Sequence, residues 1–325
     1  MDLPNHIMTH HFKPTLIMQQ TMTASLNTPR TSLELVPAPK TAKPDRLVRD
    51  LEFLTDIRPF RNYQNLGTLN RVADHIRAAF ATAGLETRFQ HWTVGGRIYT
   101  NVIGVYNSGA DRRLVVGAHY DVCGDQPGAD DNASGVAGLL ELARLVDACQ
   151  PELPYSIEFV AYCLEEPPFF ASDDMGSYIH AKSLKDENAD VIGMICLDMI
   201  GYYDDRPGSQ EVPDFISLES FAGAADFIAL AGIIPHAGFS RRVFEGMNTQ
   251  NGIRVIHHDF PTSGGLAGMS DQLNYWRFGY PAVMVNNTAF FRSPHYHQTT
   301  DTIVTLDFKK MSHVVTGLYL AVIGF

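Results

Sequence analysis

Apolar residues recur along this chain in two patterns, one typical of helices and the other of strands. Apolar side chains three or four residues apart predict amphipathic helices, whereas short runs that are apolar throughout predict strands buried on both faces. Gly95-Gly96, between two strand-like segments, predicts a hairpin. In chain order, the pattern predicts helices at 45–57 and 68–85, strands at 86–94, 99–107 and 113–119, a helix at 133–149, a strand at 156–164, a helix near 176–184 and a strand at 191–199.

The second half of the chain is less regular. Residues 204–220 are rich in turn-forming residues, 221–233 are expected to form a helix, and glycine, serine and proline in 257–270 predict a loop. The pattern then becomes regular again, and it predicts a short helix at 270–279, a strand at 281–287 and a C-terminal helix at 307–325.

Strands that alternate with helices predict an α/β fold with a mostly parallel (mixed) sheet and helices on both faces. We expect a single domain at 45–325, because no linker-like change of composition follows Pro44. Residues 1–44 have no sustained period and are expected to form a tail or arm. Three histidines of this segment are expected to be ordinary tail residues rather than metal ligands, namely His6, His10 and His11.

The composition argues against two classes of protein. A formal charge of −11 and an isoelectric point near 5.6 argue against nucleic-acid binding, which needs clustered lysine and arginine. No stretch approaches the roughly 20 apolar residues that span a bilayer, and the N-terminus lacks the features of a secretory signal. None of the four cysteines forms a CxxC pair, which favours reduced thiols. We therefore expect a cytoplasmic, soluble protein without nucleic-acid or membrane partners.

Acidic and imidazole side chains stand at or beyond the ends of the predicted strands, and one lies just ahead of a helix. The carboxyl ends of parallel strands meet at one edge of a sheet, where ligands usually bind. Taken singly, each residue has an ordinary explanation, such as a helix-cap neighbour, a turn residue, a loop histidine or a solvated charge. Together they predict one site. These residues are His119, Asp131, Glu165, Glu166, Asp198 and His297.

Two histidines with three carboxylates suit Zn²⁺, which accepts imidazole nitrogen and carboxylate oxygen. Three carboxylates and one hydroxide balance the charge of two Zn²⁺, so the charge favours a pair of cations. Asp121 is expected on the same face of the strand as His119, which it can orient, although a solvent-facing aspartate at a turn is the alternative. Glu165 points differently from its neighbour Glu166 and can move protons.

The strings GAHYD, PGADDNASGVAGLLELAR, EE followed by MGS, LDMIGYY, SDQ and YHQTTDT occur in this order. They resemble, in order, the motifs of the di-zinc aminopeptidase family, whose cousins include glutaminyl cyclases and folate-hydrolase-like carboxypeptidases. The likeness covers roughly residues 60–325. It implies a zinc-dependent exopeptidase that acts on a peptide or aminoacyl substrate with a free N-terminus.

The resemblance also implies which residues hold the two Zn²⁺ ions expected per chain. One ion would be held by His119 and Asp198, and the other by Glu166 and His297. Asp131 would bridge both ions.

Further roles follow from the same resemblance. Glu165 would act as general base and then as general acid. Tyr296 would hydrogen-bond the tetrahedral oxyanion, unless the ring only packs. Met199, Phe290 and Phe291 are candidate walls of an apolar pocket for the first substrate residue, although each also fits ordinary core packing.

Three features depart from the family pattern. PPFFASDD at 167–174 lengthens the loop after Glu166, which affects access and specificity. Gln272 stands where relatives usually have histidine, so the contact made by that histidine is expected to be absent or altered. The secretory signal and disulfide of many relatives are missing, which agrees with a cytoplasmic protein. The chain has no room for an additional dimerisation domain, so a monomer is expected.

Two other functions stay open beside the favoured aminopeptidase. A glutaminyl cyclase shares the fold and similar metal-facing residues but uses one zinc. A non-catalytic binding protein with the peptidase fold is the third possibility, although such proteins tend to lose ligands that this chain retains.

Overall fold

The computed structural model describes residues 40–212 and 223–325, and these described residues form one compact unit. The expected N-terminal tail lies almost wholly outside the described residues, as do its three histidines. The last part of the turn-rich segment 204–220 also lies outside them.

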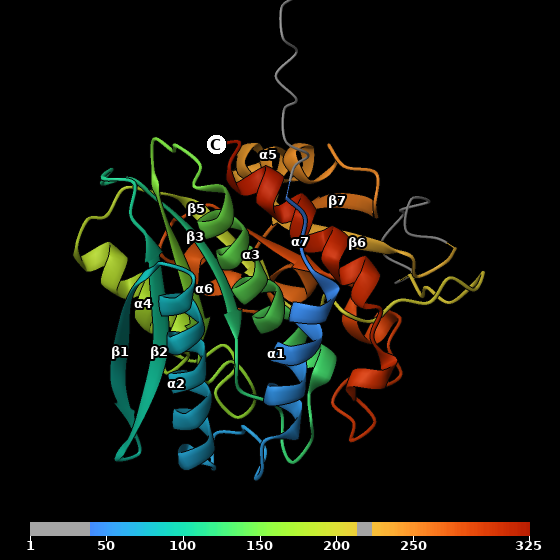
Figure 1. The fold of residues 1–325 in the computed structure, drawn as a ribbon, viewed down its shortest axis with the longest axis horizontal. Helices are drawn as coiled ribbons and strands as arrows, with labels where there is room; N and C mark the ends of the chain where they lie inside the picture. The colour runs from blue at the N-terminus through green and yellow to red at the C-terminus, as the bar shows by residue number, and fades with distance from the viewer. Residues whose placement is uncertain (1–39, 213–222) are drawn as a thin grey trace, which may run out of the picture. The chain divides into compact units, whose positions relative to one another are not determined.

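Within the described residues, eight strands form one mixed sheet in the order β1-β2-β4-β3-β5-β8-β6-β7 (Figure 1). The four central strands β4, β3, β5 and β8 are parallel, while β2 and β6 pair with them in the antiparallel sense. This arrangement confirms the predicted α/β fold and the predicted hairpin. The strands are β1 (Glu86–Val94), β2 (Arg97–Tyr106), β3 (Arg113–His119), β4 (Ser156–Tyr162), β5 (Val191–Leu197), β6 (Phe227–Ile233), β7 (Arg254–Phe260) and β8 (Ala282–Asn286).

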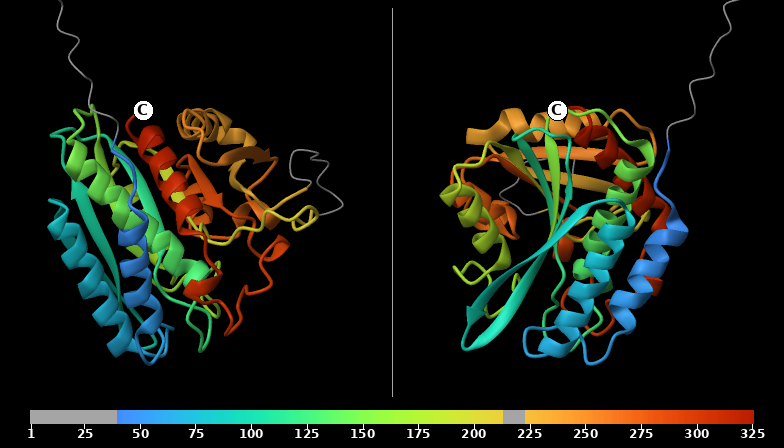
Figure 2. Two further views of the ribbon diagram at one scale, coloured as in Figure 1. Left: turned by 45° about the vertical axis from the view of Figure 1, so that its right-hand side comes forward. Right: turned by 60° about the vertical axis from the view of Figure 1, so that its left-hand side comes forward.

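Helices cover both faces of the sheet, as Figures 1 and 2 show. The larger core lies under the face covered by α1 (Pro44–Asp56), α2 (Leu66–Thr82), α3 (Gly135–Cys149), α5 (Ala237–Met247) and α7 (Phe308–Val322). The smaller core lies on the opposite face, under α4 (Gly176–Asp186) and α6 (Gln272–Arg277).

The central strands are apolar on both faces because each face is covered by helices. All seven residues of β4 are buried. Ile157 and Phe159 belong to the larger core, whereas Val160 and Tyr162 belong to the smaller one. Successive side chains of a strand point to opposite faces, so an unbroken apolar run supplies both layers.

Two predicted elements were wrong, and both lie in the second half of the chain. Phe227–Ile233 form strand β6 instead of part of a helix, because this fully buried run pairs with β8 and β7. When every residue of a short run is apolar, the sequence pattern fits a strand and a buried helix equally well. The predicted loop at 257–270 begins inside β7, which pairs with β6 along its whole length. Helix α5, between β6 and β7, was not predicted.

Within the described part of the chain, no helix combines the length and the apolar character needed to cross a bilayer. The four cysteines are all free, and Cys163 and Cys196 are buried in the core.

Candidate metal centre

The predicted site residues meet at the edge of the sheet where the parallel strands end. His119 is the last residue of β3, and Asp198 directly follows β5. Glu165 and Glu166 lie in the turn after β4. Asp131 comes from the loop ahead of α3, and the structure brings all of these together with His297.

Asp131 divides its two carboxylate oxygens between two halves of the cluster. Its Oδ1 lies 3.5 Å from Nε2 of His119, which is 3.7 Å from Oδ1 of Asp198. Its Oδ2 lies 3.1 Å from Nε2 of His297, which is 3.3 Å from Oε2 of Glu166. Ligands on a tetrahedral Zn²⁺ at 2.0–2.1 Å stand about 3.3 Å apart, which is close to these spacings. The geometry fits the predicted division into two cation positions with a shared aspartate.

Buried polar atoms in this cluster lack the partners that such atoms normally have. His119 is 1% exposed, and neither of its ring nitrogens has a hydrogen-bond partner. Oε1 of Glu166 is also buried and unpaired. Buried polar groups are almost always satisfied, and buried carboxylates need compensating positive charge. The donor set of imidazole and carboxylate therefore fits a divalent cation such as Zn²⁺.

Asp121 binds the turn that carries Glu165 and Glu166, and it also lies beside His119. Its two oxygens accept hydrogen bonds from the backbone N–H groups of Glu165 and Glu166, each at 3.2 Å. Its Oδ1 lies 3.6 Å from Nδ1 of His119, which is longer than a hydrogen bond. Asp121 thus lies beside His119 as predicted, and it also orients the turn that carries both glutamates.

The protonation behaviour of the cluster reflects burial and crowded charge. Burial raises the pKa of Glu165 well above its usual value, and the neighbouring carboxylates of Glu166 and Asp198 raise it further. Burial and the Asp131 charge raise the pKa of Glu166 to about 7. Burial alone would lower the pKa of His297, but its contacts with Asp131 and Glu166 raise it to about 10. Without a cation, the site therefore retains protons near neutral pH.

The loop that carries Asp131 is held by its two chain neighbours. Oδ1 of Asp130 accepts the backbone N–H of Gly201 at 2.8 Å, and Oδ2 accepts Asn287 Nδ2 at 2.8 Å. The Asn132 amide donates to the carbonyl of Leu197 at 2.8 Å. Both neighbours tie the loop to the strand ends, and Asp131 faces the cluster between them.

Asp301 is a supporting residue that sequence analysis did not single out. Its two oxygens accept the backbone N–H groups of Asp130 at 2.8 Å and Asp131 at 3.0 Å. The buried guanidinium of Arg61 donates to the carbonyl of Gly128 in the same loop. The signal for Asp301 was its place in YHQTTDT, but its partners Asp130 and Asp131 lie 171 and 170 residues away in sequence.

Left-handed backbone surrounds the cluster. Leu164 (φ 65°) directly precedes the glutamate pair, Met199 (φ 53°) directly follows Asp198, and His297 itself has φ 55°. Such a conformation in a non-glycine residue costs on the order of 1–3 kcal/mol, so the surrounding structure must stabilise it. Leu164 and Met199 each lie two residues beyond the end of a strand, β4 and β5 respectively.

A cavity of about 230 Å³ opens onto the cluster. Tyr296 lines it and stacks on His297, with ring centroids 3.9 Å apart. Phe170 of the PPFFASDD segment also lines it, together with Met199 and Phe290. The inserted segment therefore forms part of the wall of the site.

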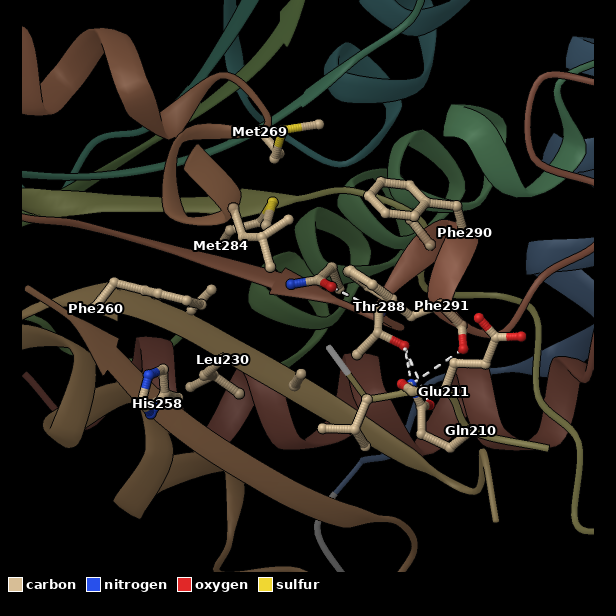
Figure 3. A pocket seen from close by; sticks show the side chains of 16 residues that line it. Gln210, Glu211, Leu230, His258, Phe260, Met269, Met284, Thr288, Phe290 and Phe291 are labelled. Carbon is tan, nitrogen blue, oxygen red and sulfur yellow. Dashed lines mark hydrogen bonds between the residues drawn. The ribbon is translucent and has the colours of Figure 1, made fainter. Parts of the chain in front are cut away.

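A second cavity of about 100 Å³ adjoins the first and shares Met269, Met284 and Phe290 with it. Figure 3 shows these side chains on one side of the cavity and Leu230 with His258 on the other. The lining is mostly apolar. Phe291, a candidate wall residue, borders this second cavity rather than the one at the cluster.

Within the SDQ motif, the environment of the aspartate is more unusual than that of the glutamine. Gln272 is fully buried and donates to the carbonyl of Ala267 at 2.8 Å. Asp271 is also fully buried, neither of its oxygens has a hydrogen-bond partner, and burial raises its pKa to about 7. The nearby charges include His119 and Asp198, so Asp271 adds to the acidity behind the site.

Among relatives with a curated sequence, uncharacterized protein YfbL of Escherichia coli (strain K12) is 40% identical over 290 residues, which are 86% of this chain and 88% of that protein. Leucine aminopeptidase 1 of Ajellomyces dermatitidis (strain ER-3 / ATCC MYA-2586) is 31% identical over 237 residues. That match covers 68% of this chain and 55% of the fungal protein.

Two solved structures show the same fold. LapB from Legionella pneumophila has a TM-score of 0.69 at 23% identity, covering 86% of this chain and 72% of that chain. Glutaminyl cyclase of Bacteroides thetaiotaomicron has a TM-score of 0.66 at 18% identity, covering 88% and 99%.

The family comparison matches residues 101–322 to Peptidase family M28. This range is more than half of the chain, and it contains every residue of the cluster described above. The chain therefore belongs to peptidase family M28.

Proposed function

We propose that this protein is a zinc-dependent aminopeptidase in which Glu165 is the general base. The single observation that carries the proposal is the position of Asp131, whose two oxygens face different histidines at 3.5 Å and 3.1 Å. The family match and the aminopeptidases among the relatives support the same activity.

In this proposal, His119 and Asp198 would hold one Zn²⁺, Glu166 and His297 would hold the other, and Asp131 would be shared. The chemistry supplied by bound zinc would be that of a Lewis acid, which polarises a carbonyl and makes a water more acidic. The unpaired buried nitrogens of His119 support the presence of a cation.

Glu165 moves the protons of the reaction. It lines the cavity, and its Oε2 lies 3.8 Å from Nε2 of His119. A carboxylate with a raised pKa accepts a proton from the attacking water and donates it to the leaving amine. Tyr296, which lines the same cavity, donates a hydrogen bond from its hydroxyl to the developing oxyanion.

The charge around the cavity favours a substrate with a free N-terminus. Four carboxylate side chains line it, those of Asp131, Glu165, Glu166 and Asp198, while the described lining contains no lysine or arginine. With two Zn²⁺ bound, the charges of Asp131, Glu166 and Asp198 are neutralised, and Glu165 remains as the anionic group that the substrate α-amine meets, while the described lining offers no cationic side chain to a C-terminal carboxylate. The substrate we propose is therefore a peptide or an aminoacyl compound. The adjoining apolar cavity is available to the side chain of its first residue.

The test is hydrolysis of aminoacyl-p-nitroanilides with and without a chelator, with N-acetylated versions of the same compounds as controls. We expect activity on the free amines, loss of that activity on chelation and recovery with Zn²⁺. Turnover that is insensitive to chelation, or equal on acetylated compounds, contradicts the proposal.

Glutaminyl cyclase is the second candidate, because such an enzyme shares the fold over 88% of this chain. Elemental analysis and an assay for pyroglutamate distinguish the two. One tightly held zinc with cyclisation of N-terminal glutamine favours the cyclase. Two zinc ions with peptide hydrolysis favour the aminopeptidase.

We further propose a monomer in the cytoplasm, where the four free thiols fit a reducing environment. Light scattering and cell fractionation test these two points.

A further inference from the structure

Cys123 lies at the border of the metal cluster, and none of the roles above uses it. It is partly buried and follows Asp121 in the segment between β3 and the Asp131 loop. One ligand atom from each of Cys123, Glu166 and His297 lies within 4.8 Å of the other two. Thiolate, carboxylate and imidazole are three kinds of ligand that Zn²⁺ accepts.

The position of Cys123 is set by contacts on both sides of it. Asp121, two residues earlier, is hydrogen-bonded to the glutamate turn. The carbonyl of Gly124, the next residue, accepts Asn62 Nδ2 at 2.8 Å. Further along, Arg61 binds the carbonyl of Gly128. These contacts hold the backbone on both sides of Cys123, and they keep its thiol near Glu166.

Glu166 supplies an independent indication of a ligand at this place. Glu166 is 4% exposed, and its Oε1 is buried without a hydrogen-bond partner. Oε2 of the same side chain is the atom that lies 3.3 Å from His297. A buried carboxylate oxygen without a partner, in a side chain that has both an imidazole and a thiol within 4.8 Å of a ligand atom, indicates that a cation belongs there.

The two cation positions differ in their supply of protein ligands. His119, Asp131 and Asp198 form one group of three, in which the fourth place of a tetrahedral ion stays open for water or substrate. The other position has Asp131, Glu166 and His297, and the Cys123 thiol lies within 4.8 Å of a ligand atom of the last two.

We propose that Cys123 Sγ is a ligand of the cation held by Asp131, Glu166 and His297, and that it makes this position selective for the thiophilic ions Zn²⁺ and Cd²⁺. The inference rests on the proposed function, because it requires the cluster to hold metal. Binding forms one sulfur–metal bond and releases the thiol proton to water. The thiolate and three carboxylates then carry four negative charges, which two divalent cations neutralise, so the thiolate takes the place of the hydroxide in the charge balance and the water at the other ion binds uncharged.

This assignment separates the tasks of the two ions. The position closed by Cys123 resembles a structural zinc site, and the position at His119 keeps the open place that a reaction needs. Soft sulfur ligands favour zinc and cadmium over hard ions such as magnesium.

The experiment is X-ray absorption spectroscopy of the zinc-loaded full-length protein, combined with zinc analysis, for the unmodified protein, Cys123→Ser and Cys149→Ser. Cys149 is the matched control, because it is also partly exposed but belongs to none of the candidate metal groups of the described chain. We expect a sulfur neighbour at about 2.3 Å in the unmodified protein and in Cys149→Ser, and only nitrogen and oxygen near 2.0–2.2 Å in Cys123→Ser.

A second measurement titrates the metal-free proteins with Cd²⁺ and follows the ultraviolet absorption of the cadmium–thiolate bond. The band is expected in the unmodified protein and in Cys149→Ser, and it is expected to disappear in Cys123→Ser. Two bound zinc ions without a sulfur neighbour overturn this inference and leave the proposed function intact. A protein that takes up no zinc overturns both. The unmodified protein alone decides the question if Cys123→Ser does not fold.

Discussion

At the scale of single residues, adjacent acidic side chains have different environments in this protein. Asp131 faces the cluster, whereas Asp130 accepts hydrogen bonds from the chain after β5. Oε2 of Glu166 lies 3.3 Å from Nε2 of His297, whereas Oε2 of Glu165 lies 3.8 Å from Nε2 of His119. Neighbouring residues in a turn point in different directions, so one short motif can serve both metal binding and its support.

Glu165→Gln tests the proposed general base directly. The change removes the carboxylate to which we assign proton transfer but keeps the size of the side chain. We expect turnover on an aminoacyl-p-nitroanilide to fall by about 10²–10⁴-fold, while zinc content stays the same. Steady-state kinetics and elemental analysis measure the two quantities, with the exposed Glu187→Gln as control. An unchanged rate would refute the role of Glu165.

Asp301→Asn tests the support of the Asp131 loop. Asp301 accepts two backbone N–H groups, and an amide can accept with only one of its two terminal atoms. A buried N–H left unpaired costs about 1–3 kcal/mol, so we expect lower stability together with weaker zinc binding. Urea unfolding of the metal-free protein and competition with a zinc indicator measure these effects. Equal stability and equal zinc affinity in both proteins count against this role.

At the scale of elements, helix α4 packs on the sheet through a buried polar network. His180 is fully buried, and its Nδ1 lies 2.6 Å from the hydroxyl of Tyr275. The nearby Glu158 is already paired with Arg88 at 3.1 Å and Arg113 at 3.4 Å. Burial, followed by the two arginine charges, lowers the pKa of His180 to about 3.

This network predicts an acid-sensitive contact. The folded His180 stays neutral down to about pH 3, whereas an unfolded histidine takes up a proton near pH 6.5. The contribution of neutral His180 to the free energy of unfolding is therefore present above pH 6.5. It is lost as the pH falls below that value, by at most about 1.4 kcal/mol per pH unit.

His180→Asn removes this titration and is expected to flatten the loss of stability between pH 6.5 and 5. The measurement is the free energy of unfolding in urea across this range, with the partly exposed His313→Asn as control. Parallel curves for the unmodified protein and His180→Asn would exclude a neutral buried His180.

At the scale of the whole molecule, the site concentrates buried carboxylates that the rest of the fold must tolerate. Burial raises the pKa of Glu166, Asp271 and Asp301 to about 7 each. A carboxyl group with a raised pKa stabilises the folded protein at low pH, and that contribution is lost as the pH rises toward 7. A bound cation removes this loss because it neutralises the charge.

Zinc is therefore expected to stabilise the protein more at pH 7 than at pH 5. Binding to the folded state alone adds about 2.7 kcal/mol when the free ion is at 100 times its Kd. Thermal unfolding with zinc and with a chelator, at both pH values, measures the difference. This account is contradicted if the difference between the unfolding temperatures with zinc and with chelator is no larger at pH 7 than at pH 5.

Most of the fold could be predicted from sequence because hydrophobic periodicity is a local property. The central strands and α3, α4, α6 and α7 were predicted near their observed positions. Strand β6 was not, because a short fully apolar run fits both a strand and a buried helix until its neighbours are known. Pairing with β8 and β7 decides the matter, and these strands are distant in sequence.

The sequence by itself determined which chemical groups stand at the strand ends, and hence that imidazoles and carboxylates would meet at one edge of the sheet. The family resemblance implied that Asp131 lies between the two histidines, but only the tertiary structure gave the distances between these groups and placed Asp301 beneath the Asp131 loop. It also placed Cys123 beside Glu166 and His297. The reason is that strand order and loop contacts join residues far apart in the chain, and local patterns carry no information on such distances.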